Sequence, residues 1–122
     1  MATKAGLEIT RAGNTAIACF KNACISDVEE ITGASAQLKQ YISASPPQRM
    51  IFDFQGVKFF SSQVLGLLLE ARAHLKPSHG EVAVASLSPL LQRVFRITNL
   101  DTIFRLYPDR AAALEPGTGP DN

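Results

Sequence analysis

The sequence predicts a single α/β domain built around a mixed β-sheet. An alternating apolar–polar segment opens the chain, and strand-like segments then alternate with helix-like ones. Such alternation implies parallel strands joined by crossover helices, whereas an opening hairpin adds one antiparallel pair. The expected order is β-β-α-β-α-β-α-β. Because the 122 residues contain no internal repeat or linker, we expect residues 1–114 to form one domain and residues 115–122, rich in Pro and Gly, to form a flexible C-terminal tail.

The first element is a β-hairpin. Residues 7–11 alternate apolar and polar side chains with the period of a half-buried strand. Residues 12–14, Ala-Gly-Asn, have the chemistry of a turn, and residues 15–20 resume strand character.

A helix and a central strand follow. Ser26 and Glu29 have the spacing of a capping box, which marks a helix start. Apolar spacing predicts one buried face of this helix, comprising Val28, Ile31, Ser35, Leu38 and Ile42. Two prolines after Ser45 end it. Residues 49–54 then form a near-continuous apolar run, which is typical of a central strand covered on both faces.

The second half of the chain repeats the alternation. Residues 62–76 predict a largely buried helix and residues 82–85 a short buried strand. Ser88 and Pro89 have the pattern of an N-cap followed by proline at the first helical position. The apolar face of this third helix is expected to hold Leu91, Val94, Phe95 and Thr98. Residues 103–107 predict a last strand, and residues 109–114 one or two helical turns.

Composition excludes several classes of function. Twelve basic and eleven acidic residues give a net charge of +1, which offers no strong attraction to nucleic acid or to an anionic membrane. No apolar run approaches the roughly 20 residues of a membrane helix, and the first residues lack the apolar region of a secretory signal. We therefore expect a cytoplasmic protein with no nucleic-acid or membrane partner.

No motif predicts an enzyme, a cofactor or a metal site. The phosphate-binding patterns G-x-x-x-x-G-K-[ST] and G-x-G-x-x-G are absent, as is the nucleophile elbow G-x-S-x-G. Cys19 and Cys24 lie outside the C-x-x-C spacing of redox and zinc motifs, and His74 and His79 add too few ligands for a metal. The histidines suit solvated positions at a helix end.

Asp53 and the serines at the start of the second helix form the candidate site. Asp53 lies near the carboxyl end of the central strand, where α/β sheets place their sites. Ser61 and Ser62 begin the most apolar helix. A serine here has two interpretations: a simple N-cap, or a phosphate acceptor at a position that tolerates negative charge.

Residues 50–68, MIFDFQGVKFFSSQVLGLL, resemble the core of STAS domains, the anti-sigma factor antagonist family. That core has an apolar strand with an Asp, a short turn, and D-S-[ST]-G-L-G opening a helix. The resemblance extends over about residues 7–114 through His79-Gly80, residues 87–89 and residues 98–104. It implies a mixed sheet with helices mainly on one face.

Carried over by position, Ser62 occupies the serine that the family phosphorylates. Ser61 stands where an Asp usually precedes it, Gln63 replaces the second Ser or Thr, and Val64 replaces a Gly. Losing the Asp removes a capping carboxylate that a kinase could read.

The remaining positions match the family. Leu65 and Gly66 agree with its pattern, and Asp53 matches its strand Asp, which supports the local geometry of the site. Asp53 either satisfies loop amides or takes a direct part in phosphorylation. Leu65, Leu68 and Leu69 could each face the core or a docking surface.

The resemblance implies partner switching. The unmodified protein would dock onto an ATPase-like serine kinase that is also an anti-sigma factor, phosphorylation would break this complex, and a serine phosphatase would restore it. One alternative is a non-phosphorylated STAS-like scaffold or sensor subunit that binds a protein or a small ligand through the same surface. A receiver domain phosphorylated on Asp53 ranks last, because no acidic cluster follows the first strand. The sequence leaves the oligomeric state open.

Overall fold

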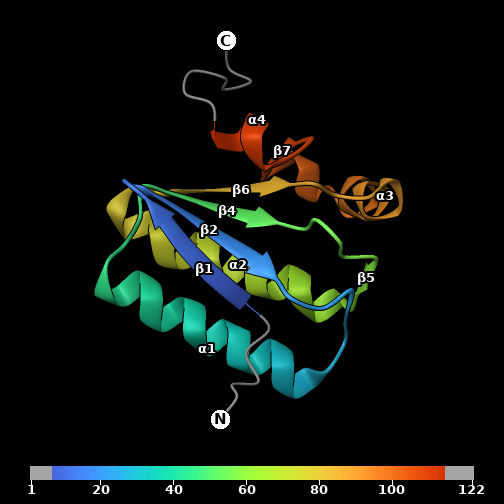
Figure 1. Ribbon diagram of the computed structural model, residues 1–122, viewed down its shortest axis with the longest axis horizontal. Helices are drawn as coiled ribbons and strands as arrows, with labels where there is room; N and C mark the ends of the chain where they lie inside the picture. Colours follow the sequence, from blue (N-terminus) through green and yellow to red (C-terminus); the bar gives the residue numbers. More distant parts are fainter. Residues whose placement is uncertain (1–6, 115–122) are drawn as a thin grey trace.

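The computed structural model describes residues 7–114, which form a five-stranded mixed sheet (Figure 1). The strand order is β1-β2-β4-β6-β7, with β1 antiparallel to β2 and every other neighbour parallel. The strands are β1 (Leu7–Ala12), β2 (Thr15–Phe20), β4 (Arg49–Asp53), β6 (Glu81–Ala85) and β7 (Arg105–Tyr107). The predicted hairpin and the mixed sheet are thus confirmed.

Helices cover mainly one face of the sheet, as predicted. Helices α1 (Val28–Ala44) and α2 (Ser62–Leu75) lie side by side beneath it in Figure 1, whereas the short α4 (Arg110–Leu114) lies on the opposite side. Helix α3 (Pro89–Ile97) lies at one end of the sheet, and two 3₁₀ turns, η1 (Lys76–Ser78) and η2 (Leu100–Thr102), complete the connections.

The central strand β4 contributes side chains to both faces, as its apolar run predicts. Met50 and Phe52 belong to the large core between the sheet and helices α1 and α2, and Ile51 belongs to a smaller cluster on the side of α4. All three side chains are fully buried. Because strand residues alternate between faces, Asp53 lies on the face of Ile51, the side that α4 covers.

A second, two-stranded sheet was not predicted. Strand β3 (Cys24–Ile25) pairs in parallel with β5 (Phe59–Phe60), directly before α2. Two-residue strands are too short to show a period of two in the sequence. Their pairing depends instead on the path of the chain around α1.

Two expected helix faces are partly wrong. The N-cap of α1 is Asp27, whose side chain accepts a hydrogen bond from Glu29 N, so Ser26 is not the cap. Val28 falls in the first turn with its side chain 58% exposed, because the buried face of α1 runs through Ile31, Leu38 and Ile42. In α3, Ser88 is the cap as predicted, but Thr98 follows the helix and is exposed.

The last strand begins two residues later than predicted. Ile103 follows the 3₁₀ turn η2 and is 42% exposed, so pairing with β6 starts at Arg105. The predicted tail, residues 115–122, lies outside the described residues. Within residues 7–114, no helix has the length and apolar character needed to cross a membrane.

Candidate functional site

The small β3–β5 sheet fixes the start of α2. Ser61 N donates to Ile25 O at 2.9 Å, and Lys58 N and Phe59 N both donate to Ala23 O. These bonds hold the chain in an extended conformation up to Ser61, whose φ and ψ are −78° and 162°. The helix therefore begins at Ser62, as the sequence predicts.

Ser61 is the N-cap of α2, but only through its backbone. Val64 N donates to Ser61 O at 3.0 Å, whereas the Ser61 side chain makes no capping bond. Its Oγ is buried and has no hydrogen-bond partner among the described residues. The Ser61 hydroxyl is thus shielded from solvent.

The amino end of α2 has no negatively charged or capping side chain of its own. By contrast, α1 has the Asp27 cap followed by two glutamates, and α3 has the Ser88 hydroxyl bonded to Leu91 N at 3.3 Å. The positive end of the α2 dipole and its free amides thus lack a negative partner of their own.

Ser62 is the first helical residue, and it is exposed. Gln63 and Gly66 are also exposed on the first turns of α2, while Val64 points into the core. A Cβ added at Gly66 would meet no atom within 4 Å, so packing does not require a glycine there. The structure therefore brings Ser61, Ser62, Gln63 and Gly66 together on one helix start.

Asp53 lies in a different environment. The residue is 2% exposed, and its carboxylate accepts hydrogen bonds from Gln55 N at 3.1 Å and from Arg110 Nε at 2.9 Å. The first bond holds the loop after β4, and the second holds α4 against the opposite face of the sheet. Asp53 thus affects the start of α2 only through the backbone of the loop that leads to it.

Arg110 and Cys19 complete this cluster, and the sequence pattern did not reveal them. Arg110 Nη2 lies 2.7 Å from Cys19 Sγ. Burial raises the pKa of the Cys19 thiol, and the nearby Arg110 charge only partly offsets this effect. The hydrogen bond to Asp53 is the main cause that raises the pKa of Arg110. Asp53 and Arg110 are separated by 57 positions, and no local motif connects them.

An open groove runs between α1 and α2 beside the candidate site. Gln63, Gly66 and Leu67 line it from α2, and Ile31 and Ser35 from α1. Ser35 Oγ donates to Glu70 Oε1 across it at 2.5 Å. Among residues 7–114, no three His, Cys, Asp or Glu side chains gather as a metal site needs.

The leucines of α2 divide between core and surface. Leu68 is fully buried, Leu65 is half-buried, and Leu69 is 40% exposed. The exposed side of this helix is thus built mainly from polar and small residues rather than from leucine.

Comparisons with known proteins agree with this architecture. The sequence model of the STAS domain matches residues 15–113. A STAS-domain containing protein of Pseudomonas aeruginosa (strain UCBPP-PA14) is 27% identical over 63 residues, which are 52% of this chain and 62% of that protein. The match thus spans less than two thirds of the length of this relative.

Solved structures resemble the fold over most of the chain. A domain described as an anti-sigma-factor antagonist from Planctomyces limnophilus superposes with a TM-score of 0.79 at 22% identity, over 88% of this chain and 94% of that one. The anti-sigma factor antagonist SpoIIAA in its unphosphorylated form gives 0.74 at 17% identity, over 88% and 92%. The Bacillus SpoIIAA in its phosphorylated form gives 0.68 at 17% identity, over 88% and 96%.

Proposed function

Because this chain belongs to the STAS domain family, we propose that it is an anti-sigma factor antagonist controlled by reversible phosphorylation of Ser62. In this proposal the unmodified protein binds a serine kinase that is also an anti-sigma factor, and so releases a sigma factor. Phosphorylation ends this binding, and a serine phosphatase restores it. We further propose a cytoplasmic location, because the kinase consumes ATP. The protein acts by binding and not by catalysis.

The observation that carries the proposal is the contrast between two adjacent serines. Ser61 Oγ is buried, whereas Ser62 is exposed at the first position of α2. A kinase can therefore reach Ser62 but not Ser61. In the transfer, Ser62 Oγ bonds to the γ-phosphorus of ATP, the bond to the β-phosphate oxygen breaks, ADP leaves, and the hydroxyl proton passes to a base of the kinase.

The new phosphate would suit the fold but alter the surface. It adds about −1.5 to −2 charges and three acceptor oxygens. The free amides and dipole of the α2 start favour such a group, so the folded state keeps its stability. A partner surface packed against Ser62 would have to desolvate the added dianion, or would be repelled by it. The modification therefore changes binding far more than folding.

Phosphate mapping tests the proposal. The protein is incubated with ATP and a serine kinase of the anti-sigma factor class from the same organism, and the modified residue is located by mass spectrometry. We expect one phosphate on Ser62, its loss in Ser62→Ala, and its retention in the matched control Ser61→Ala. Modification at Ser61 or elsewhere, or none at all, contradicts the assignment.

Binding measurements separate switching from a second function. We expect Ser62→Asp to weaken kinase binding at least tenfold, which is about 1.4 kcal/mol, with Ser62→Ala close to wild type. The alternative is a scaffold or sensor subunit that is not switched, and the Ser61 position favours it because this turn lacks the family's carboxylate. Equal affinities of the Ser62→Asp variant and the wild type would support the scaffold.

A further inference from the structure

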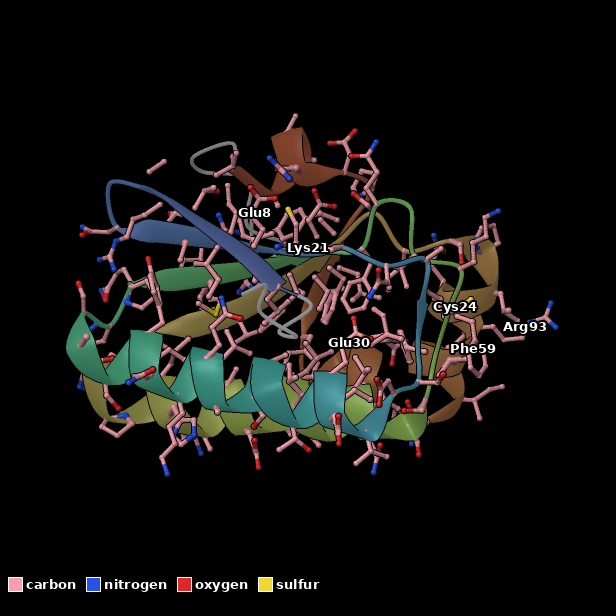
Figure 2. All side chains as sticks on the ribbon, turned by 60° about the horizontal axis from the view of Figure 1, so that its bottom comes forward. Glu8, Lys21, Cys24, Glu30, Phe59 and Arg93 are labelled. Carbon is pink, nitrogen blue, oxygen red and sulfur yellow. The ribbon has the colours of Figure 1, made fainter. Side chains whose placement is uncertain are left out.

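An exposed surface of apolar and basic side chains adjoins the candidate site. We infer that this β5–α3 surface, comprising Phe59, Leu90, Arg93 and Ile97, docks the partner kinase through an apolar patch rimmed by carboxylates on that partner. The side chains of Phe59, Leu90 and Ile97 are 50%, 56% and 73% exposed. Figure 2 shows Phe59 and Arg93 at the same end of the molecule, both directed outward.

Buried aromatic contacts join the two elements of this surface. Phe60 of β5 and Phe95 of α3 pack edge to face with their ring centroids 6.4 Å apart. Both rings face the core, so the neighbouring Phe59 faces solvent, because side chains alternate along a strand.

Helix α3 likewise buries one face in the core and exposes the other to solvent. Leu91 and Phe95 are buried. Leu90, Arg93 and Ile97 are spaced at i, i+3 and i+7, so they share the opposite helix face. Soluble proteins rarely leave several large apolar side chains exposed together unless a partner covers them.

The surface lies within reach of Ser62. Phe59 precedes Ser62 by three residues, a separation that an extended chain covers in about 10 Å. A protein interface of standard size buries about 800 Å² on each partner, and a patch of that area is roughly 30 Å across, which is well beyond this separation. A partner seated on Phe59 therefore covers the Ser62 hydroxyl as well.

Charge identifies the chemistry of the occupant. Residues 55–63 and 88–99 include Lys58, Arg93 and Arg96 but no Asp or Glu. All three basic side chains belong to exposed residues. A second copy of this chain would place like charges against each other, which disfavours self-association through this surface. An acidic rim around an apolar centre complements it.

This inference rests on the proposed function and gives the phosphate a second effect. The three basic side chains supply a local charge of about +3 at neutral pH. A phosphate on Ser62 would cancel up to two of these charges and would also repel the partner's carboxylates. The switch then acts on the whole β5–α3 surface and not only on the helix start.

Charge reversal tests the surface in the intact protein. The probe is the same anti-sigma factor kinase, and affinity is measured at several NaCl concentrations by titration calorimetry. We expect Arg93→Glu to weaken binding about tenfold or more and to reduce its salt dependence. Ile97→Ser is expected to weaken binding several-fold. Lys39→Glu, an equal charge change at an exposed position of α1, should stay within about twofold of wild type.

The outcomes separate the two proposals. If the kinase binds and phosphorylates wild type on Ser62, yet Arg93→Glu binds like wild type, the surface assignment is overturned while the proposed function stands. If no kinase of this class binds or modifies wild type, the proposed function fails and the partner assignment fails with it. Circular dichroism of each variant confirms folding, so lost binding cannot come from unfolding.

A lipid surface is the competing occupant. Sedimentation with vesicles of phosphatidylglycerol and phosphatidylcholine in equal parts tests it, with vesicles of pure phosphatidylcholine as the control. We expect no binding to either. Binding to the anionic vesicles that Arg93→Glu abolishes would replace the protein partner with a membrane and so overturn the inference.

Discussion

At the scale of single residues, the buried Asp53 carboxylate determines how α4 is held. A buried charge is tolerated only when it is paired and hydrogen-bonded. Arg110 supplies the pair, and Gln55 N supplies a further hydrogen bond. Arg49 holds the other end of α4 by donating to Ala113 O, and it also donates to the Tyr107 hydroxyl of β7. Two guanidinium groups thus fix a five-residue helix that would not be stable alone.

Removing the Arg110 side chain should destabilise the fold. Arg110→Ala leaves the Asp53 carboxylate buried without its ion pair, which costs 3–5 kcal/mol for a fully buried pair. Because the Arg110 side chain is 44% exposed, water partly replaces it, and we expect a loss of about 1–2 kcal/mol. Urea denaturation at pH 7 measures it. The control Arg93→Ala should change the free energy of unfolding by less than about 0.5 kcal/mol. Equal midpoints for both variants would contradict the role of the pair.

At the scale of elements, the three long helices begin in three different ways. Helix α1 uses an Asp cap and two acidic residues, α3 uses a Ser cap and a proline, and α2 uses backbone contacts from the β3–β5 sheet. The first two starts are encoded locally. The third depends on strands that are distant in sequence, and it alone leaves the helix amides open to an added phosphate.

The start of α1 can be tested with neighbouring substitutions. Asp27→Ala removes the acceptor of the Glu29 N–H bond and should cost about 1 kcal/mol of unfolding free energy. Ser26→Ala, one residue earlier, should change it by less than about 0.5 kcal/mol, because Ser26 is not the cap. Thermal unfolding followed by circular dichroism gives both values. A larger loss for Ser26→Ala would restore the capping box that the sequence indicates.

At the scale of the whole molecule, the sheet separates two cores of unequal size. The large core lies between the sheet and helices α1 and α2, and the small one lies between the sheet and α4. Phe20, Phe54, Phe60 and Phe95 form a chain of ring contacts from the sheet to α3, which makes α3 part of the same core. The backbone of β5 and α3 that carries the outward side chains is therefore anchored to the core.

Substitutions of two phenylalanines distinguish an effect on folding from an effect on binding. Phe52 is fully buried in the large core, and Phe52→Ala should cost about 3–5 kcal/mol, a large part of the 5–15 kcal/mol typical of a domain. Phe59 is half exposed, and Phe59→Ala should cost less than about 1 kcal/mol while weakening the kinase complex. Urea denaturation gives the first comparison and calorimetric binding the second. A severe stability loss in Phe59→Ala would show that this ring belongs to the core.

Local sequence patterns were enough to predict the order of the main elements, the hairpin and the central strand. These features follow from periodicity and turn chemistry within about 20 residues, which act before any long-range contact forms. The Ser88 cap is local in the same sense, and it was predicted correctly. The family likeness of residues 50–68 also depends on consecutive residues, and it predicts Ser62 as the acceptor position.

Three features depended on the tertiary structure: which of the two serines is accessible, what Asp53 binds, and how β5 packs against α3. Each of these depends on atoms brought together from distant positions: Ile25 with Ser61, Arg110 with Asp53, and Phe60 with Phe95. No local pattern encodes such pairs, because burial depends on what the rest of the chain packs against a residue. The exposure of Ser62 and the burial of its neighbour are properties of the assembled fold.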